Sequence, residues 1–159
     1  METKFLELII PLETLRLTKT GLLKGTIFFR IGDFCFPDSD WEDLVDQLFC
    51  LWIGIIWFNE ELNVLDNHTE IILQFMDGPD QIRLTRLENE LFSCVLETYY
   101  SDDDVDIIHK FHINLSDLKK EIKLVCLKVL HYCYDHKLFS DDIDNLREVF
   151  ESIEEPFVD

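Results

Sequence analysis

The sequence predicts an α+β domain in which a largely antiparallel sheet of about six strands packs against three helices. Three observations predict it: apolar and polar residues alternate between turn residues, apolar residues recur at helical spacing near the C-terminus, and residues 48–58 are apolar throughout. The expected order of elements is ββαββββαα. A chain of 159 residues falls within the usual size of one domain, so we expect 1–159 to form a single globular domain.

Two strands are expected first, over residues 4–17 and 22–31. The second has the clearer pattern, because Leu23, Gly25 and Ile27 alternate with polar residues. Gly21 lies between the two segments and suits a tight turn, so the strands should pair as a hairpin.

A buried helix is expected next. Ser39 followed three residues later by Glu42 matches a capping box, which predicts a helix start near Asp40. Segment 48–58 is apolar on every side and, at eleven residues, is shorter than the roughly 20 needed to cross a bilayer. Such a helix must be covered on every side, either by the rest of the chain or by a second copy in a homodimer.

Four more strands are expected to form two hairpins. The turn residues Asp77, Gly78, Pro79 and Asp80 join the first pair, and an acidic turn at 101–104 joins the second. The four strands are expected at 70–76, 81–87, 91–100 and 105–113.

Two helices should close the chain. Ser116 is expected to cap the first, which should end near His136, and Ser140 is expected to cap the second. One face of the last helix is apolar and the opposite face is acidic. Its apolar residues are Ile143, Leu146, Phe150 and Ile153.

The composition is strongly acidic, with 33 Asp and Glu against 14 Lys and Arg and a formal charge of −19. The resulting negative field repels DNA, RNA and anionic lipid, so direct binding to nucleic acid or to a membrane is disfavoured. A basic protein partner is favoured. The N-terminus lacks the features of a secretory signal, and we therefore expect a cytoplasmic location.

No cofactor, metal or catalytic motif is recognisable. Two histidines three residues apart, His109 and His112, point to opposite faces of a strand, and His109 is expected at the margin of the core. The five cysteines form no CxxC pair, so we expect reduced, packed thiols. Paired carboxylates are abundant, but nothing marks one with the raised pKa that acid–base catalysis needs. An enzyme is therefore not expected.

Two acidic groups are candidate partner-binding sites. Like charges along one helix face oppose each other without helping the fold, which favours a binding role, although a solvated face is the simpler alternative. The first group is the hairpin turn with Asp102, Asp103, Asp104 and Asp106, and the second is the last helix with Asp141, Asp144, Glu148 and Glu151.

Part of the chain resembles a known class of proteins. A Phe-Pro-Asp-x-x-Trp segment (Phe36, Pro37, Asp38, Trp41) precedes the apolar helix, and a Met-Asp-Gly hairpin (Met76, Asp77, Gly78) follows it. Residues 23–90 with these features resemble small acidic bacterial immunity proteins encoded beside polymorphic or contact-dependent toxins. The resemblance implies binding and neutralisation of a cognate toxin domain, often a nuclease, but it assigns no contact residue.

Two alternatives from other classes stay open at this point. One is an enzyme whose site is assembled from residues distant in sequence. The other is an acidic adaptor or DNA mimic that acts on a DNA-binding partner. The acidic charge favours a basic partner in both binding hypotheses.

Overall fold

The computed structural model describes residues 1–58 and 70–154 as an α+β fold with antiparallel sheets and three α-helices. The helices are α1 (Val45–Phe58), α2 (Leu115–Asp135) and α3 (Asp141–Glu154), and a 3-10 turn, η1, spans Leu12–Thr14. The strands are β1 (Glu7–Ile9), β2 (Arg16–Leu17), β3 (Leu23–Thr26), β4 (Phe28–Ile31), β5 (Phe34–Phe36), β6 (Glu42–Leu44), β7 (Glu70–Gln74), β8 (Asp80–Glu88), β9 (Leu91–Ser101) and β10 (Asp104–Asn114).

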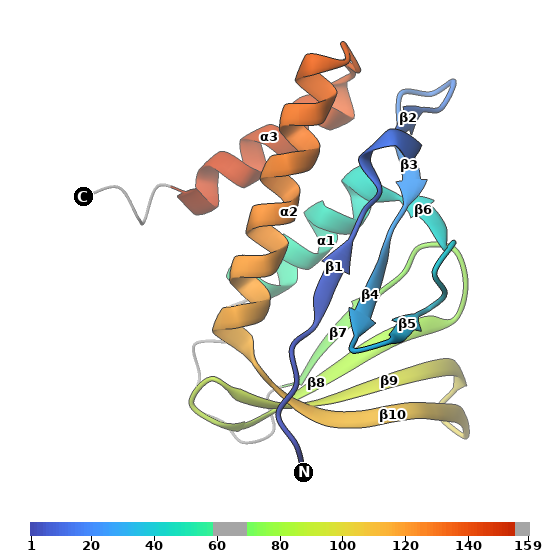
Figure 1. Ribbon diagram of the computed structural model, residues 1–159, viewed down its shortest axis with the longest axis vertical. Helices are drawn as coiled ribbons and strands as arrows, with labels where there is room; N and C mark the ends of the chain where they lie inside the picture. The colour runs from blue at the N-terminus through green and yellow to red at the C-terminus, as the bar shows by residue number, and fades with distance from the viewer. Residues whose placement is uncertain (59–69, 155–159) are drawn as a thin grey trace.

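The strands form three sheets. The largest has the order β10-β9-β8-β7, and two small sheets have the orders β1-β4-β5 and β2-β3-β6. In Figure 1 the small sheets stand above the large one, and the three helices gather beside them. One cluster of buried apolar side chains draws on the sheets and on all three helices, so these layers share a core.

The expected order ββαββββαα is not confirmed, because six strands rather than two precede α1. Segment 4–17 is not one strand: Pro11 lies between β1 and η1, and proline donates no hydrogen bond to a ladder. Segment 22–31 divides at Ile27, whose N–H donates to the Trp41 carbonyl (2.9 Å), so β3 and β4 enter different sheets. The pairing expected across Gly21 is confirmed by β2 and β3.

The start of α1 also differs from the expectation. Residues 42–44 pair with β3 as strand β6, so the helix begins at Val45 and not near Asp40. Ser39 does not cap it; the Ser39 N–H instead donates to the Asp38 carboxylate (2.7 Å). The pattern of a capping box was present, but ladder pairing with β3 prevailed over it.

Helix α1 is the centre of the core. Its Trp52 is fully buried, donates from Nε1 to the Gln74 carbonyl (3.1 Å), and packs against Phe29 and Phe75 with ring centroids 5.4 and 5.8 Å away. Within this single chain, α1 has seven buried side chains: Val45, Asp46, Leu48, Phe49, Trp52, Ile53 and Ile56. Among the described residues no helix is long and apolar enough to cross a membrane.

The two closing helices largely follow the sequence expectation. Asn114, rather than Ser116, caps α2, because its carboxamide accepts from the N–H groups of Ser116 and Asp117. The Ser140 hydroxyl accepts from the Ile143 N–H (3.2 Å), which confirms the expected cap of α3. The four apolar residues expected on the inner face of α3 are all buried.

Candidate functional site

The tip of the β9–β10 hairpin projects beyond the rest of the large sheet. Asp80, the first residue of β8, pairs with Thr98, so residues 99–101 of β9 pair only with β10. Figure 1 shows this two-stranded extension reaching away from the helices. The expected acidic turn therefore lies at the end of an exposed hairpin.

Apolar side chains are exposed along this hairpin. The exposed fraction is 61% for Tyr100, 54% for Ile107 and 42% for Ile108. The register with β9 shifts between Ile107 and His109, which marks a β-bulge that leaves Ile108 without a partner in the ladder. The bulge breaks the alternation read from the sequence, so His109 is exposed and not at the core margin; its ring contacts Phe34 edge-on at 4.5 Å.

Two other segments lie against the base of the hairpin. The Tyr99 N–H donates to the Pro79 carbonyl (2.9 Å), and the Thr98 hydroxyl donates to Asp80 (2.8 Å), which attaches turn 76–80. Asp43 then attaches loop 38–43 to that turn. We call the combined surface of 38–43, 76–80 and 99–108 the acidic end.

Asp43 is the buried connection within the acidic end. It is 2% exposed, and its Oδ2 accepts from the Trp41 indole (3.0 Å) and from the N–H groups of Met76 (2.9 Å) and Asp77 (3.3 Å). A carboxylate with several donors satisfies groups that would otherwise be buried without partners. Asp43 therefore holds two acidic segments side by side.

The charge of the acidic end is entirely negative, since its three segments contain no Lys, Arg or His. A hydrogen bond to Arg16 lowers the pKa of Glu42, and the bond that Tyr99 donates to Asp102 raises the pKa of the phenol. The exposed carboxylates are those of Asp38, Asp40, Glu42, Asp77, Asp102, Asp103, Asp104 and Asp106.

A polar network underlies the base of the hairpin. Glu97 is 3% exposed and accepts from Gln81 Nε2 (2.8 Å) and from Arg83 Nε (2.9 Å). Arg83 also bridges to Glu70 at the edge strand β7 (2.5 Å). A buried carboxylate is stable only when it is paired in this way, so the network fixes β7, β8 and β9 beneath the tip.

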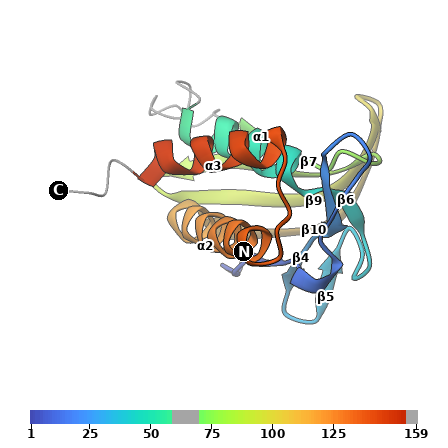
Figure 2. The ribbon, with the colours of Figure 1, turned by 90° about the horizontal axis from the view of Figure 1, so that it is seen from above.

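The second predicted group, on α3, lies elsewhere. Asp141, Asp144, Glu148 and Glu151 are all exposed as expected, but α3 is at the opposite end of the molecule from the β9–β10 tip (Figures 1 and 2). The structure therefore does not bring the two predicted groups together. One compact partner surface would contact one group or the other.

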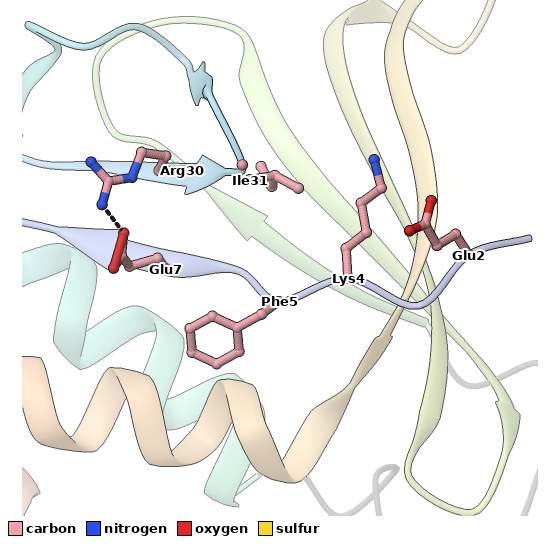
Figure 3. Close-up of a pocket in the computed structure, with 7 residues that line it drawn as sticks. Glu2, Lys4, Phe5, Glu7, Arg30 and Ile31 are labelled. Atoms are coloured by element: carbon pink, nitrogen blue, oxygen red, sulfur yellow. Dashed lines mark hydrogen bonds and ion pairs between the residues drawn. The ribbon is translucent and has the colours of Figure 1, made fainter.

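An open hollow of about 480 Å³ lies where the N-terminal segment meets β4 (Figure 3). Its charged groups are Glu2, Lys4 and the ion pair between Arg30 and Glu7, whose partners are about half exposed. Exposed pairs of this kind contribute little and are common on surfaces. None of the charged residues that line the hollow is buried, so we do not assign it a site.

All five cysteines are free, and burial strongly raises the pKa of Cys94 and Cys126, which makes them poor nucleophiles. Within residues 1–58 and 70–154, no group of His, Cys, Asp and Glu has the arrangement of a metal site.

Comparison with known proteins found no match to any family model, curated protein or solved structure.

Proposed function

We propose that this chain is an immunity-type binding protein whose acidic end docks onto a basic surface of a cognate toxin domain. The observation that carries the proposal is the acidic end itself, where exposed Tyr100, Ile107 and Ile108 lie among carboxylates without a single basic residue in its segments. Sequence reasoning located the charge but not the apolar side chains beside it.

Exposed apolar side chains among carboxylates are the combination from which protein interfaces obtain affinity and a high association rate. Aromatic and aliphatic side chains at the centre of an interface supply the desolvated contacts, and a polar rim surrounds them. Carboxylates around that centre attract a basic partner and accelerate its association. A nuclease domain must present positive charge to phosphate, so it is the favoured class of toxin.

The tip is favoured over α3 for a structural reason. The exposed residues of α3 are all polar, because Ile143, Leu146, Phe150 and Ile153 face the core. An acidic helix face without an apolar anchor steers a partner but offers little desolvated contact area. The acidic end has both components.

Protection of growth tests the proposal. The gene neighbourhood is determined first, and a toxin domain encoded there is produced in a bacterial host, alone and together with the chain. We expect the wild-type chain to restore growth, Asp103→Lys/Asp104→Lys to lose protection, and Glu148→Lys/Glu151→Lys to retain it. Failure of the wild-type chain to protect, or a neighbourhood of metabolic genes without a toxin, contradicts immunity and favours the enzyme alternative.

A further inference from the structure

The outer edge of β10 is a further feature of the acidic end. Strand β10 lies at one end of the sheet β10-β9-β8-β7, so its only partner strand is β9. Its other side, which we call the outer edge, pairs at one position: the His112 N–H donates to the Glu2 carbonyl (3.0 Å), and the His112 carbonyl accepts from the Lys4 N–H (2.8 Å). Among the described residues, no segment pairs with 104–111 on this side. In Figure 1 this part of β10 forms the lower margin of the molecule.

The ladder identifies the backbone groups that face the outer edge. The Tyr99 N–H donates to the Pro79 carbonyl, so the peptide groups of Tyr99 face β8 and make no hydrogen bond with its β10 partner Val105. In such a pair of an antiparallel ladder, the peptide groups of the two residues point away from each other. The N–H and C=O groups of Val105 therefore point to the outer edge, and those of Ile107 do so by alternation.

The outer edge is exposed and carries apolar side chains. Residues 106–110 are all exposed, with exposed fractions of 54% for Ile107 and 42% for Ile108. The Phe34 ring borders the edge through its contact with His109 (4.5 Å). An edge with unpaired backbone groups and accessible side chains is where an extended segment adds to a sheet.

The charge of the edge determines which segment it favours. One end carries His109 and Lys110, and the end at the hairpin tip carries four aspartates: Asp102, Asp103, Asp104 and Asp106. The aspartates outnumber the one lysine, so an incoming strand with basic side chains near the tip is attracted. A second copy of the chain would bring the same aspartates and a net charge of −19, so it is repelled.

We propose that the outer edge of β10, over residues 105–110, binds an extended basic segment of the toxin domain as an added β-strand. This proposal rests on the proposed function, since it names how the partner contacts the acidic end. Main-chain hydrogen bonds to Val105 and Ile107 hold the segment, and Ile107 and Ile108 contact its apolar side chains. The N-terminal segment already pairs with the same edge at His112, so the edge accepts a strand in this way.

Proline at position 105 tests the proposal, because it removes an N–H that points outward. Val105→Pro loses a donor to the added strand and keeps the bonds between β9 and β10, and proline is found at such edge positions. Val105→Ala is the matched control, since it shortens the side chain and keeps the N–H. In surface plasmon resonance with the toxin domain, we expect Val105→Pro to weaken binding by about fivefold or more and Val105→Ala by less than about twofold. Circular dichroism should show a native fold for both.

A peptide probe tests the edge without the toxin. A blocked peptide as long as 105–110, in which lysine and valine alternate, is added to the isotope-labelled full chain and followed by NMR. We expect saturable shifts of the Val105 and Ile107 amide signals. A peptide in which glutamate and valine alternate is expected to leave these signals unchanged, because the aspartates repel it.

Three results overturn the proposal: equal toxin binding by Val105→Pro and Val105→Ala, no shift of the Val105 and Ile107 signals with the lysine peptide, or dimerisation of the chain alone that Val105→Pro abolishes. The last result would assign the edge to a second copy. A wild-type chain that binds no toxin contradicts the immunity function itself. A chain that binds toxin equally well with proline or alanine at position 105 contradicts only the added strand, so the two failures are distinguishable.

Discussion

Replacing Asp43 tests how loop 38–43 is held against turn 76–80. The carboxylate is 2% exposed and accepts four hydrogen bonds. Its Oδ1 accepts from the neighbouring Leu44 N–H, and its Oδ2 accepts from the Trp41 indole and from the N–H groups of Met76 and Asp77. Asp43→Ala removes both carboxylate oxygens and leaves all four donors without this acceptor. Among the described residues, Asp43 is the only side chain whose hydrogen bonds join loop 38–43 to turn 76–80, and Asp43→Ala removes this connection.

The magnitude follows from the surroundings of those donors. A donor buried without a partner costs about 1–3 kcal/mol, whereas a donor that reaches water costs less. Met76 and Asp77 are exposed residues, and Trp41 and Leu44 are half-buried, so the four losses are partly compensated by hydration. We expect Asp43→Ala to lower the free energy of unfolding by about 2–4 kcal/mol, and Tm by about 5–15 °C for a chain of this size.

Urea denaturation and a thermal melt measure this loss, with Asp40→Ala as the matched control. Asp40 lies in the same loop and is exposed, so the same change of charge there should alter stability by less than about 0.5 kcal/mol. Asp43→Asn retains one acceptor oxygen and should fall between the two. If Asp43→Ala is as stable as Asp40→Ala, the carboxylate does not hold the acidic end together.

Two further predictions concern the core. Trp52→Ala should lower the free energy of unfolding by about 3–5 kcal/mol in a urea melt, since it removes a fully buried ring and leaves a cavity; an unchanged stability would show that α1 is not the centre of the core. Asp46 is buried, and desolvation raises its pKa above the ordinary value, so the folded state binds its proton more tightly than the unfolded state. The stabilisation from this proton is present at low pH and is lost as pH rises through the raised pKa. Between about pH 4 and pH 7, the stability of the wild-type chain should therefore fall relative to Asp46→Asn, and a difference independent of pH would contradict this reasoning.

The sequence predicted best those features that depend on neighbours in the chain. Ser140 caps α3 through an N–H three residues away, and the apolar face of that helix follows its own 3.6-residue period. The two hairpins of β7–β10 depend on turn residues between adjacent strands. Both kinds of signal are local, and both predictions are confirmed.

Features set by distant pairing were missed. Strand β6 forms because β3 lies alongside residues 42–44, although the same residues carry the pattern of a helix start. The bulge after Ile107 shifts the alternation of β10, and no local residue pattern marked it.

In the candidate site, too, the local features were predicted and the contacts between distant residues were not. The carboxylates of Asp102, Asp103 and Asp104 were evident as a run, but Asp43 meets Met76 across 33 positions of the chain. Similarly, Glu97 meets Gln81 across 16 positions. A single sequence does not reveal such partners, so it gave the charge of the site without its framework or its apolar centre.

The association rate with the partner tests the central claim most directly. Surface plasmon resonance, with the chain captured at low density and the toxin domain in solution, compares Asp103→Lys/Asp104→Lys with Glu148→Lys/Glu151→Lys, which change the net charge equally. If the acidic end is the binding surface, the first variant slows association by about tenfold or more, and the second has a smaller effect. An unaltered on-rate for the first variant, with a native circular dichroism spectrum, would contradict the claim. Equal slowing by both variants would show that the overall negative charge steers the partner and that the acidic end has no special role.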